Sequence, residues 1–335
     1  MKKRITWIDI LRIIGMIGVI TIHIVGNTIN TFGLSGNAKT IFLVVCKSCY
    51  FTLPLFVMIS GSLFLSKDIC YKDMFLKYIK RILFVIVFIG GAFAFMEEFF
   101  INRTINMILI HNVFNRIITG GLWEHMWYLY LIMALYLITP LFRVWCKNSN
   151  KNDQQILLII LFVFTILKYD IDNIFGINIA FYIPFSSGFL FAYLLGFYLY
   201  NNQLSYKNEL FLNILGLLSM ILVAVLTYFD IANYLVGYTT TLSIIIAANI
   251  YVLIKKVNIK SIRISNMIKL LGECSFGIYI FHQLFINIVY KVLKIDIILR
   301  FPYAFLPIYI LLMFIITFIF VYFLRKIKIV RKYFI

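Results

Sequence analysis

The sequence predicts an all-α protein that crosses a membrane about ten times and forms one membrane-embedded domain over residues 1–335. Hydrophobic residues make up 63% of the chain and charged residues only 13%, whereas soluble domains are roughly 45–50% apolar and about 25% charged. No long polar, charge-rich stretch interrupts the apolar segments to form a soluble domain. The composition therefore indicates a multi-pass integral membrane protein with the lipid bilayer as its principal partner.

Apolar stretches long enough to span a bilayer recur along the whole chain. A transmembrane helix needs about 20 predominantly apolar residues, and the fifth candidate falls short of that length. We expect spans near residues 5–27, 41–65, 80–100, 122–142, 156–168, 184–201, 209–229, 234–254, 274–293 and 303–324.

The basic residues between these spans predict the orientation. With both termini in the cytoplasm, 22 of the 31 Lys and Arg residues fall on the cytoplasmic side and 8 on the other. Cytoplasmic loops of membrane proteins carry such an excess. The formal net charge of +18 thus has a topological explanation, and we expect no nucleic-acid partner.

The N-terminal sequence MKKR and the apolar run after it resemble a signal peptide. No small-residue cleavage site follows, and Asp9 and Arg12 interrupt the apolar core. We therefore expect a retained first helix.

Five scattered cysteines predict neither a disulfide framework nor a metal site. The CKSC sequence at 46–49 has redox spacing, but no second Cys or His pair accompanies it. Between the third and fourth spans we expect a polar outer loop over 101–121, with His111 at its surface and Glu97 and Glu98 at a solvated helix end.

Three titratable residues interrupt the first span. Asp9 and Arg12 are three residues apart and can pair on one helical face. His23 follows Arg12 by eleven residues, about three helical turns, so both face the same way, about 16 Å apart along the axis. Charged side chains within a membrane helix face a bundle interior or a water-filled cavity. An interfacial ion pair and a helix–helix hydrogen bond would be the structural alternative.

Histidine and arginine together favour group transfer. Histidine exchanges protons near neutral pH, and arginine binds phosphate groups such as those of a coenzyme. The chain has no phosphate-binding GxxxxGK[ST] loop, no HExxH and no GxSxG motif, and it has no acidic cluster for a metal.

Four motifs in order resemble the acyltransferase 3 family of integral-membrane O-acyltransferases. IDILRIIGMIGVITIH contains Arg12 and His23 at the family spacing of the first helix. LPLFVMISGSLFL (53–65) resembles the family's Pro-Leu-Phe…Ser-Gly-Phe-Leu segment, with Ser62 in place of a usual bulky residue. EHMWYLYLIMALYLITPL (124–141) resembles its His-Leu-Trp-Phe-Leu helix, and LGECSFGIYIFHQLF (271–285) its closing Ser…Tyr-x-x-His segment.

The resemblance implies an enzyme that transfers an acetyl group from cytoplasmic acetyl-CoA to a hydroxyl of a lipid-linked or cell-surface glycan. It is nearest to compact bacterial members that modify surface polysaccharides in the plasma membrane. By this resemblance His23 would be the catalytic base or acyl-handling residue. Arg12, paired with Asp9, would bind the coenzyme or orient the site. No metal cofactor is implied.

Two further groups are candidates within this family reading. Lys77, Lys80 and Arg81 enter the third span from the cytoplasm and are candidates to bind the pyrophosphate of the coenzyme, although ordinary topological charge explains them equally well. His282 matches the closing family motif and is a candidate for coenzyme binding or a packed hydrogen-bonding residue.

The outer mouth of the fourth span suits a sugar acceptor. Glu124 and His125 lie beside Trp127 and Tyr128, and a carboxylate next to aromatic rings suits a glycan. Trp and Tyr are also routine at membrane interfaces.

Two other classes of function remain open. A transporter or flippase of a lipid-linked sugar or of an acyl-group carrier fits the size and the buried charge, but no paired repeats of broken helices are present. A non-catalytic membrane partner of envelope enzymes is the third possibility, and the intact Arg12–His23 pair argues against it.

Overall fold

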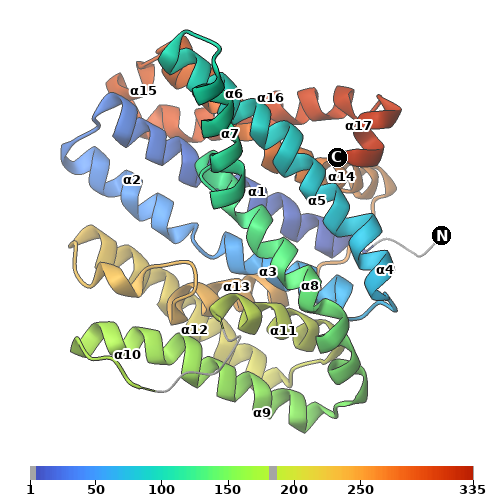
Figure 1. Ribbon diagram of the computed structural model, residues 1–335. Coiled ribbons are helices and arrows are strands. Elements are labelled where there is room, and N and C mark those ends of the chain that lie inside the picture. Colours follow the sequence, from blue (N-terminus) through green and yellow to red (C-terminus); the bar gives the residue numbers. More distant parts are fainter. Residues whose placement is uncertain (1–4, 181–186, 335) are drawn as a thin grey trace. The chain divides into compact units, whose positions relative to one another are not determined.

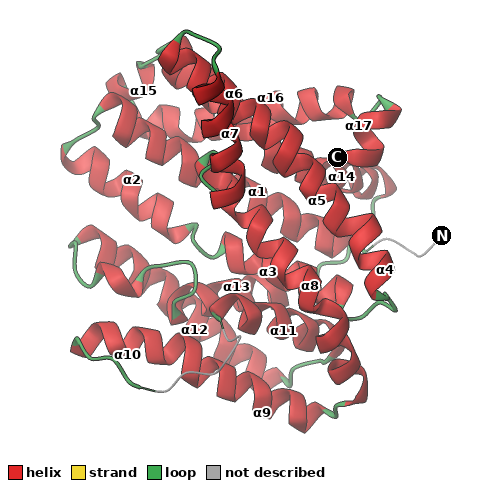
Figure 2. Cartoon of the chain, viewed as in Figure 1, coloured by secondary structure: helices red, strands yellow, loops and turns green. Residues whose placement is uncertain are grey.

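The computed structural model describes residues 5–180 and 187–334. Every regular element in these ranges is helical and none is a strand (Figure 2). This confirms the predicted all-α class. The chain forms two compact units, Met1–Ser66 with Ser149–Val321 (unit 1) and Lys67–Asn148 with Tyr322–Ile335 (unit 2).

Unit 1 contains the first two long apolar segments and most of the second half of the chain, as labelled in Figure 1. The α-helices of unit 1 are α1 (Thr6–Phe32), α2 (Gly36–Ser48), α3 (Thr52–Phe64), α9 (Lys151–Leu161), α10 (Lys168–Phe175), α11 (Gly188–Asn201), α12 (Tyr206–Tyr228), α13 (Thr241–Lys255), α14 (Ile262–Asn287), α15 (Ile297–Arg300) and α16 (Pro302–Leu324), whose end from Tyr322 belongs to unit 2. Its shorter segments are the π-helices η4 (Phe162–Leu167) and η6 (Ile288–Val292) and the 3₁₀-helix η5 (Asn233–Leu235).

Unit 2 contains the third and fourth predicted spans and the C-terminal segment. Its α-helices are α4 (Tyr71–Asp73), α5 (Lys80–Phe84), α6 (Gly91–Asn102), α7 (Met107–Thr119), α8 (Trp127–Asn148) and α17 (Lys328–Tyr333). The π-helices η1 (Met74–Ile79) and η2 (Val85–Gly90) continue α4 and α5, and the 3₁₀-helix η3 (Glu124–Met126) precedes α8.

Seven segments in the described part of the chain are long and apolar enough to cross a membrane. They include α1, α12 and α16 as single helices and α2–α3 as one segment with a break at 49–51. Of the other expected spans, 184–201 begins in residues outside the described ranges and continues as the short apolar helix α11, 234–254 overlaps the short apolar helix α13, and 274–293 covers the second half of α14 and η6. A multi-pass membrane protein is thus supported. The count of ten, the cytoplasmic termini and the single domain stay predictions.

Small residues allow the helices of unit 1 to approach closely. A Cβ atom on Gly61 of α3 would collide with the backbone carbonyl of Tyr193 on α11. One residue later, the buried Ser62 hydroxyl donates to the Gly196 carbonyl oxygen at 2.8 Å and contacts the Tyr251 hydroxyl of α13 at 2.6 Å. Small interfacial residues and short hydrogen bonds are how membrane helices pack without a hydrophobic driving force. Ser62, which departs from the family motif, thus links three helices.

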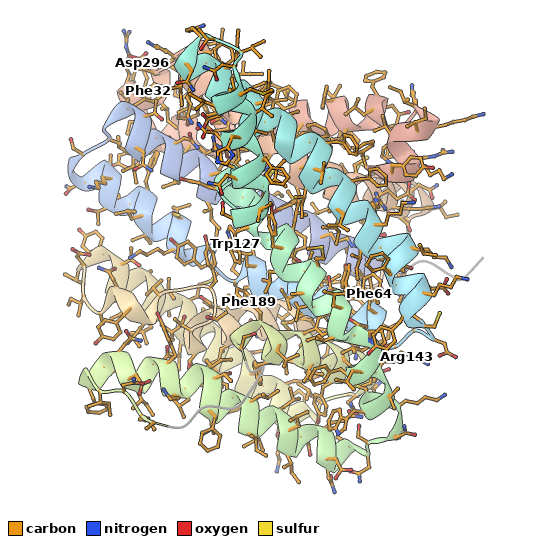
Figure 3. The ribbon with its side chains drawn as sticks, in the orientation of Figure 1. Phe32, Phe64, Trp127, Arg143, Phe189 and Asp296 are labelled. Atoms are coloured by element: carbon orange, nitrogen blue, oxygen red, sulfur yellow. The ribbon has the colours of Figure 1, made fainter. Side chains whose placement is uncertain are left out.

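The C-terminal ends of α1 and α3 lie at two different ends of unit 1. Figure 3 labels Phe32 at the end of α1 and Phe64 at the end of α3, at opposite sides of the unit. The Phe32 ring stacks on Tyr290 of η6 with ring centroids 5.0 Å apart. The ends of α1 and of the α14–η6 segment therefore meet at one end of unit 1.

The polar segment 101–121 is largely helical, so the expectation of a loop is wrong. Asn106 caps α7 by accepting the backbone N–H of Leu109, and α7 packs on α6. Arg116 pairs with Glu97 at 2.8 Å and with Glu98 at 3.2 Å. The two glutamates are therefore engaged in an ion-pair network and are not merely a solvated helix end. The reason is tertiary: only the α6–α7 hairpin brings Arg116 to them.

Candidate active site

The interface between α1 and α14 carries the first candidate site residues. Asp9 is 1% exposed and accepts a 2.9 Å hydrogen bond from Arg12 Nη1. The pair predicted from the three-residue spacing is therefore present. Gly272 of α14 lies directly against Asp9, because a Cβ at this position would collide with the Asp9 carboxylate. The close approach of α14 thus buries the carboxylate and holds it beside Arg12.

His23 lies beside His282 at the same interface. Their ring centroids are 5.2 Å apart and the rings are inclined by 52°. His282 is fully buried, and its Nδ1 lies 2.8 Å from the carbonyl oxygen of Tyr279 and 3.2 Å from that of Ile278. A carbonyl oxygen can only accept, so Nδ1 of His282 carries a proton and donates it. In the neutral ring this leaves Nε2 with an unshared electron pair.

A third polar contact lies further along α1. The Thr28 hydroxyl is 2.9 Å from the hydroxyl of Tyr290, and both residues are buried. Where α1 meets the α14–η6 segment, three polar pairs thus lie along α1: the Asp9–Arg12 ion pair within the helix, the His23–His282 ring pair and the Thr28–Tyr290 hydroxyl pair. Polar groups inside a membrane bundle line functional sites or pathways by default. Of the stripe that the first span predicts, the Asp9–Arg12 pair is present and His23 faces α14; Thr28 lies about 140° further round the helix than His23 and was not predicted.

The basic candidates of unit 2 have different surroundings. Lys77 forms an ion pair with Asp73 at 2.9 Å, and its side chain is 64% exposed. Lys80 is exposed and lies 5.7 Å from the centroid of the Phe84 ring. Arg81 is half-buried and has Tyr136 and Arg325 as electrostatic neighbours. Of the three, only Arg81 points into the unit.

The candidate acceptor residues at the start of α8 also divide by exposure. His125 is 3% exposed, whereas Glu124 is exposed and Trp127, labelled in Figure 3, is 36% exposed. Tyr128 is half-buried. Glu124 and Trp127 thus lie at the surface of unit 2, and His125 packs inside it.

Some participants were not evident in the sequence. Trp123, next to Glu124 in the sequence, stacks face to face on Phe93 with centroids 4.1 Å apart. Tyr290 and Arg325 carry no motif signal. His282 was predicted among the coenzyme-binding residues, and the structure places it in unit 1 beside His23, while Lys77, Lys80 and Arg81 belong to unit 2.

Metal-binding and disulfide features are also defined for the described residues. Across 5–180 and 187–334 no group of three or more His, Cys, Asp or Glu side chains could hold a metal ion. Cys46 and Cys49 of the CKSC sequence are both free thiols, the first buried and the second half-buried.

Comparison with known proteins gives a family. No curated protein and no solved structure matches the chain significantly. The family described as an acyltransferase domain matches residues 5–326, nearly the whole chain, including Arg12, His23 and His282. This chain therefore belongs to the acyltransferase 3 family of membrane acyltransferases.

Proposed function

We propose that this protein is an O-acetyltransferase of the bacterial plasma membrane that transfers an acetyl group from cytoplasmic acetyl-CoA to a hydroxyl of a lipid-linked or cell-surface glycan. The observation that supports this most strongly is the histidine pair, His23 beside His282, in the interface between α1 and α14. Family membership supports the transfer of an acyl group. The identity of the donor and of the acceptor is the proposal.

The chemistry requires a base at the acceptor hydroxyl. In our proposal His23 accepts the hydroxyl proton while the oxygen attacks the thioester carbonyl, so a C–O bond forms. The C–S bond then breaks, and the leaving thiolate takes the proton from the His23 imidazolium. The products are the acetyl ester and the free thiol of the coenzyme, and no outside reactant is consumed.

Arg12 and His282 support His23 in different ways. His282 has its Nδ1 proton held by the Tyr279 carbonyl, and its ring packs against that of His23. We assign it a positioning role, to fix the orientation of the His23 ring. Arg12, held by Asp9, places a positive charge on the same helix and is the candidate to orient the anionic coenzyme toward the site.

Donor and acceptor have candidate contacts in unit 2. Lys77, Lys80 and Arg81 are proposed to contact the coenzyme phosphates, with the half-buried Arg81 as the best placed. The exposed Glu124 and Trp127 are proposed to contact the glycan, because an aromatic ring beside a carboxylate can stack on a sugar and accept its hydroxyl hydrogen bonds.

The test uses membranes that contain the protein and a lipid-linked glycan acceptor, with radiolabelled acetyl-CoA. We expect alkali-labile label on the glycan with the parent protein and none with His23→Ala. His111→Ala, an exposed histidine of α7, is the matched control and should retain full activity. Undiminished transfer by a folded His23→Ala protein would contradict the role of His23.

The transporter reading gives a different result. A transporter or flippase would move a lipid-linked sugar across vesicles without consuming acetyl-CoA. If neither protein transfers label, binding of acetyl-CoA to the purified parent decides: binding keeps the enzyme proposal and directs attention to the acceptor, whereas no binding favours transport.

A further inference from the structure

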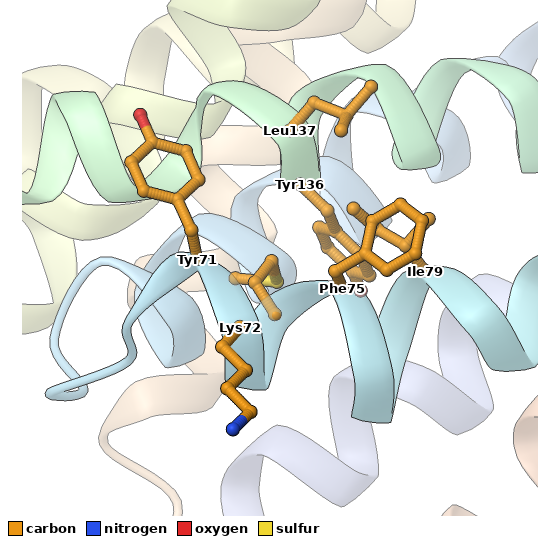
Figure 4. A pocket seen from close by; sticks show the side chains of 7 residues that line it. Tyr71, Lys72, Phe75, Ile79, Tyr136 and Leu137 are labelled. Carbon is orange, nitrogen blue, oxygen red and sulfur yellow. The ribbon is translucent and has the colours of Figure 1, made fainter.

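Unit 2 contains a pocket that none of the motifs identifies. It has a volume of about 330 Å³, within the range of small-molecule sites. Figure 4 shows its walls, which come from the α4–η1 segment and from α8. Its lining includes Tyr71, Lys72, Phe75, Ile79, Tyr136 and Leu137.

The walls of this pocket suit a flat ring. Tyr71, Phe75 and Tyr136 supply three aromatic rings, and Ile79 and Leu137 add apolar surface. Tyr78 packs edge-on against Tyr136 with centroids 6.4 Å apart and supports it from one side. Stacking on aromatic side chains is a general way to bind a nucleobase, whose faces are all π-surfaces.

The backbone of one wall is also unusual. Phe75 and Ile79 belong to the π-helix η1. Such insertions are rare and occur frequently at functional sites. Here the wider turn of η1 presents the ring of Phe75, which is 51% exposed, and the Ile79 side chain at the pocket.

Arg81 follows the pocket residue Ile79 by two positions and has Arg325 as an electrostatic neighbour. Tyr136 lines the pocket and is also an electrostatic neighbour of Arg81. Arg325, which follows the last residue of α16, is the other such neighbour of Arg81. The Nε atoms of both guanidinium groups are buried. Two cations repel each other when partly removed from water, and an anion bound between them relieves the repulsion.

The charge of the surrounding segments points the same way. The residues 67–81, 143–147 and 325–332 contain twelve Lys and Arg and two acidic residues, and we call them the basic end of unit 2. Both acidic residues are already paired, Asp68 with Arg143 and Asp73 with Lys77; Figure 3 labels Arg143. A polyanionic ligand would therefore meet a strong excess of positive charge.

We propose that the pocket of Tyr71, Phe75 and Tyr136, with Arg81 and Arg325 beside it, binds the phosphorylated nucleoside end of the acyl donor. The base stacks among the three rings, and the two guanidinium groups bind the phosphates. This inference rests on the proposed use of an acyl-CoA donor and adds Arg325 and the aromatic pocket to the predicted Arg81. It assigns nucleotide recognition to residues of unit 2.

The test measures binding of adenosine 3′,5′-bisphosphate, which lacks the thioester, to the purified full chain in nanodiscs of zwitterionic lipid. We expect Arg81→Gln and Arg325→Gln each to raise Kd about 10–100-fold, because each removes a charge-assisted contact to phosphate. Tyr136→Ala should raise it about 10-fold, through lost stacking. Arg331→Gln, on the exposed face of α17, is the matched control and should stay within about twofold.

Two outcomes would overturn the site. One is unchanged bisphosphate affinity in folded Arg81→Gln and Arg325→Gln, and the other is an equal loss in Arg331→Gln, which would indicate a diffuse charge effect. Nanodiscs with anionic lipid test whether the site binds the phosphates of a nucleotide or those of a lipid headgroup. Abolition of bisphosphate binding there, at equal ionic strength, would mean that a lipid headgroup occupies the site, contrary to the proposal.

Failure of the site and failure of the proposed function are distinguishable. If transfer proceeds and Arg325→Gln leaves the KM for acetyl-CoA unchanged, the site is wrong and the enzyme proposal stands. If the bisphosphate binds with the expected dependence on both arginines but no acetyl group is transferred, the nucleotide site stands and the transfer proposal fails.

Discussion

The α1–α14 interface of unit 1 and the basic end of unit 2 both concentrate titratable side chains, but they hold them in opposite ways. At the interface, Asp9 and His282 are buried, and each has a specific partner within 3 Å. At the basic end, Lys77 and Lys80 are exposed and belong to an excess of like charges. A buried group that loses its partner has no water to replace it, so we expect a substitution at the interface to have a large effect. An exposed lysine is surrounded by water and by other lysines, so we expect its substitution to have a small effect.

Of the two regions, we expect the histidine pair at the α1–α14 interface to show the largest effects of mutation on activity. We expect His23→Ala to lower kcat by about 10²–10⁴-fold, the usual contribution of a general base. His282→Gln should lower it only about tenfold, because it acts through His23. The double variant should be no slower than His23→Ala, since the two residues act as a unit. Steady-state rates at saturating donor test this. Fully additive losses in the double variant would show that His282 acts independently.

The next effect is a packing effect at the same interface. Gly272→Ala should destabilise the protein by about 1–3 kcal/mol, because the added Cβ collides with the Asp9 carboxylate. Thermal unfolding in detergent measures it. Gly26→Ala on α1 is the matched control: a Cβ there meets no atom within 4 Å, so the better helix former should stabilise by up to about 1 kcal/mol. Equal melting temperatures for both variants would contradict the tight α1–α14 contact.

A smaller effect is expected at Ser62. Ser62→Ala removes the hydroxyl shared by the Met58 and Gly196 carbonyls and the Tyr251 hydroxyl. We expect a loss of about 1–2 kcal/mol in unfolding free energy, since buried partners lose a hydrogen bond. Thr119→Ala, which removes an exposed hydroxyl bonded only within α7, should change stability by less than about 0.5 kcal/mol. Unfolding curves that rank the two variants the other way would refute a linking role for Ser62.

The smallest effect is expected at the basic end. Lys77→Gln breaks an exposed ion pair with Asp73, and such pairs contribute about 0–1 kcal/mol. The variant should keep its melting temperature, and its KM for the donor should rise by less than about threefold. A tenfold or larger rise in KM would show that the proposed contact of the exposed Lys77 with the donor contributes as much as a buried arginine would, and the contrast between the two regions would then be weaker than we infer.

The sequence predicts the parts of the site that depend on local spacing. Asp9 and Arg12 pair because residues three apart share a helical face. His23 stands out because a titratable residue is rare in a membrane helix. Partners from distant segments could not be predicted from spacing. Arg116 reaches Glu97 only through the α6–α7 hairpin, and Arg325, from the far end of the chain, is an electrostatic neighbour of Arg81.

The assignment of His282 shows the same limit. Its motif marked it as a candidate residue, but spacing could not tell whether it lies with the basic residues or with His23. Gly272 determines which of the two it is, because its missing side chain lets α14 approach Asp9 of α1. Ten residues further along α14, His282 then lies beside His23.

By itself the sequence determined the all-α class, the membrane environment, the family and the polar stripe of α1. These follow from composition, from hydrophobic periodicity and from contacts within one helix, all of which are local along the chain. The tertiary structure alone decided which side chains meet across helices: the partner of His23, the packing role of Ser62 and the aromatic pocket beside Arg81 and Arg325. The physical reason is that such contacts depend on how closely segments far apart in sequence approach each other. The sizes of the side chains at each interface set this approach, and residue spacing along the chain does not reveal it.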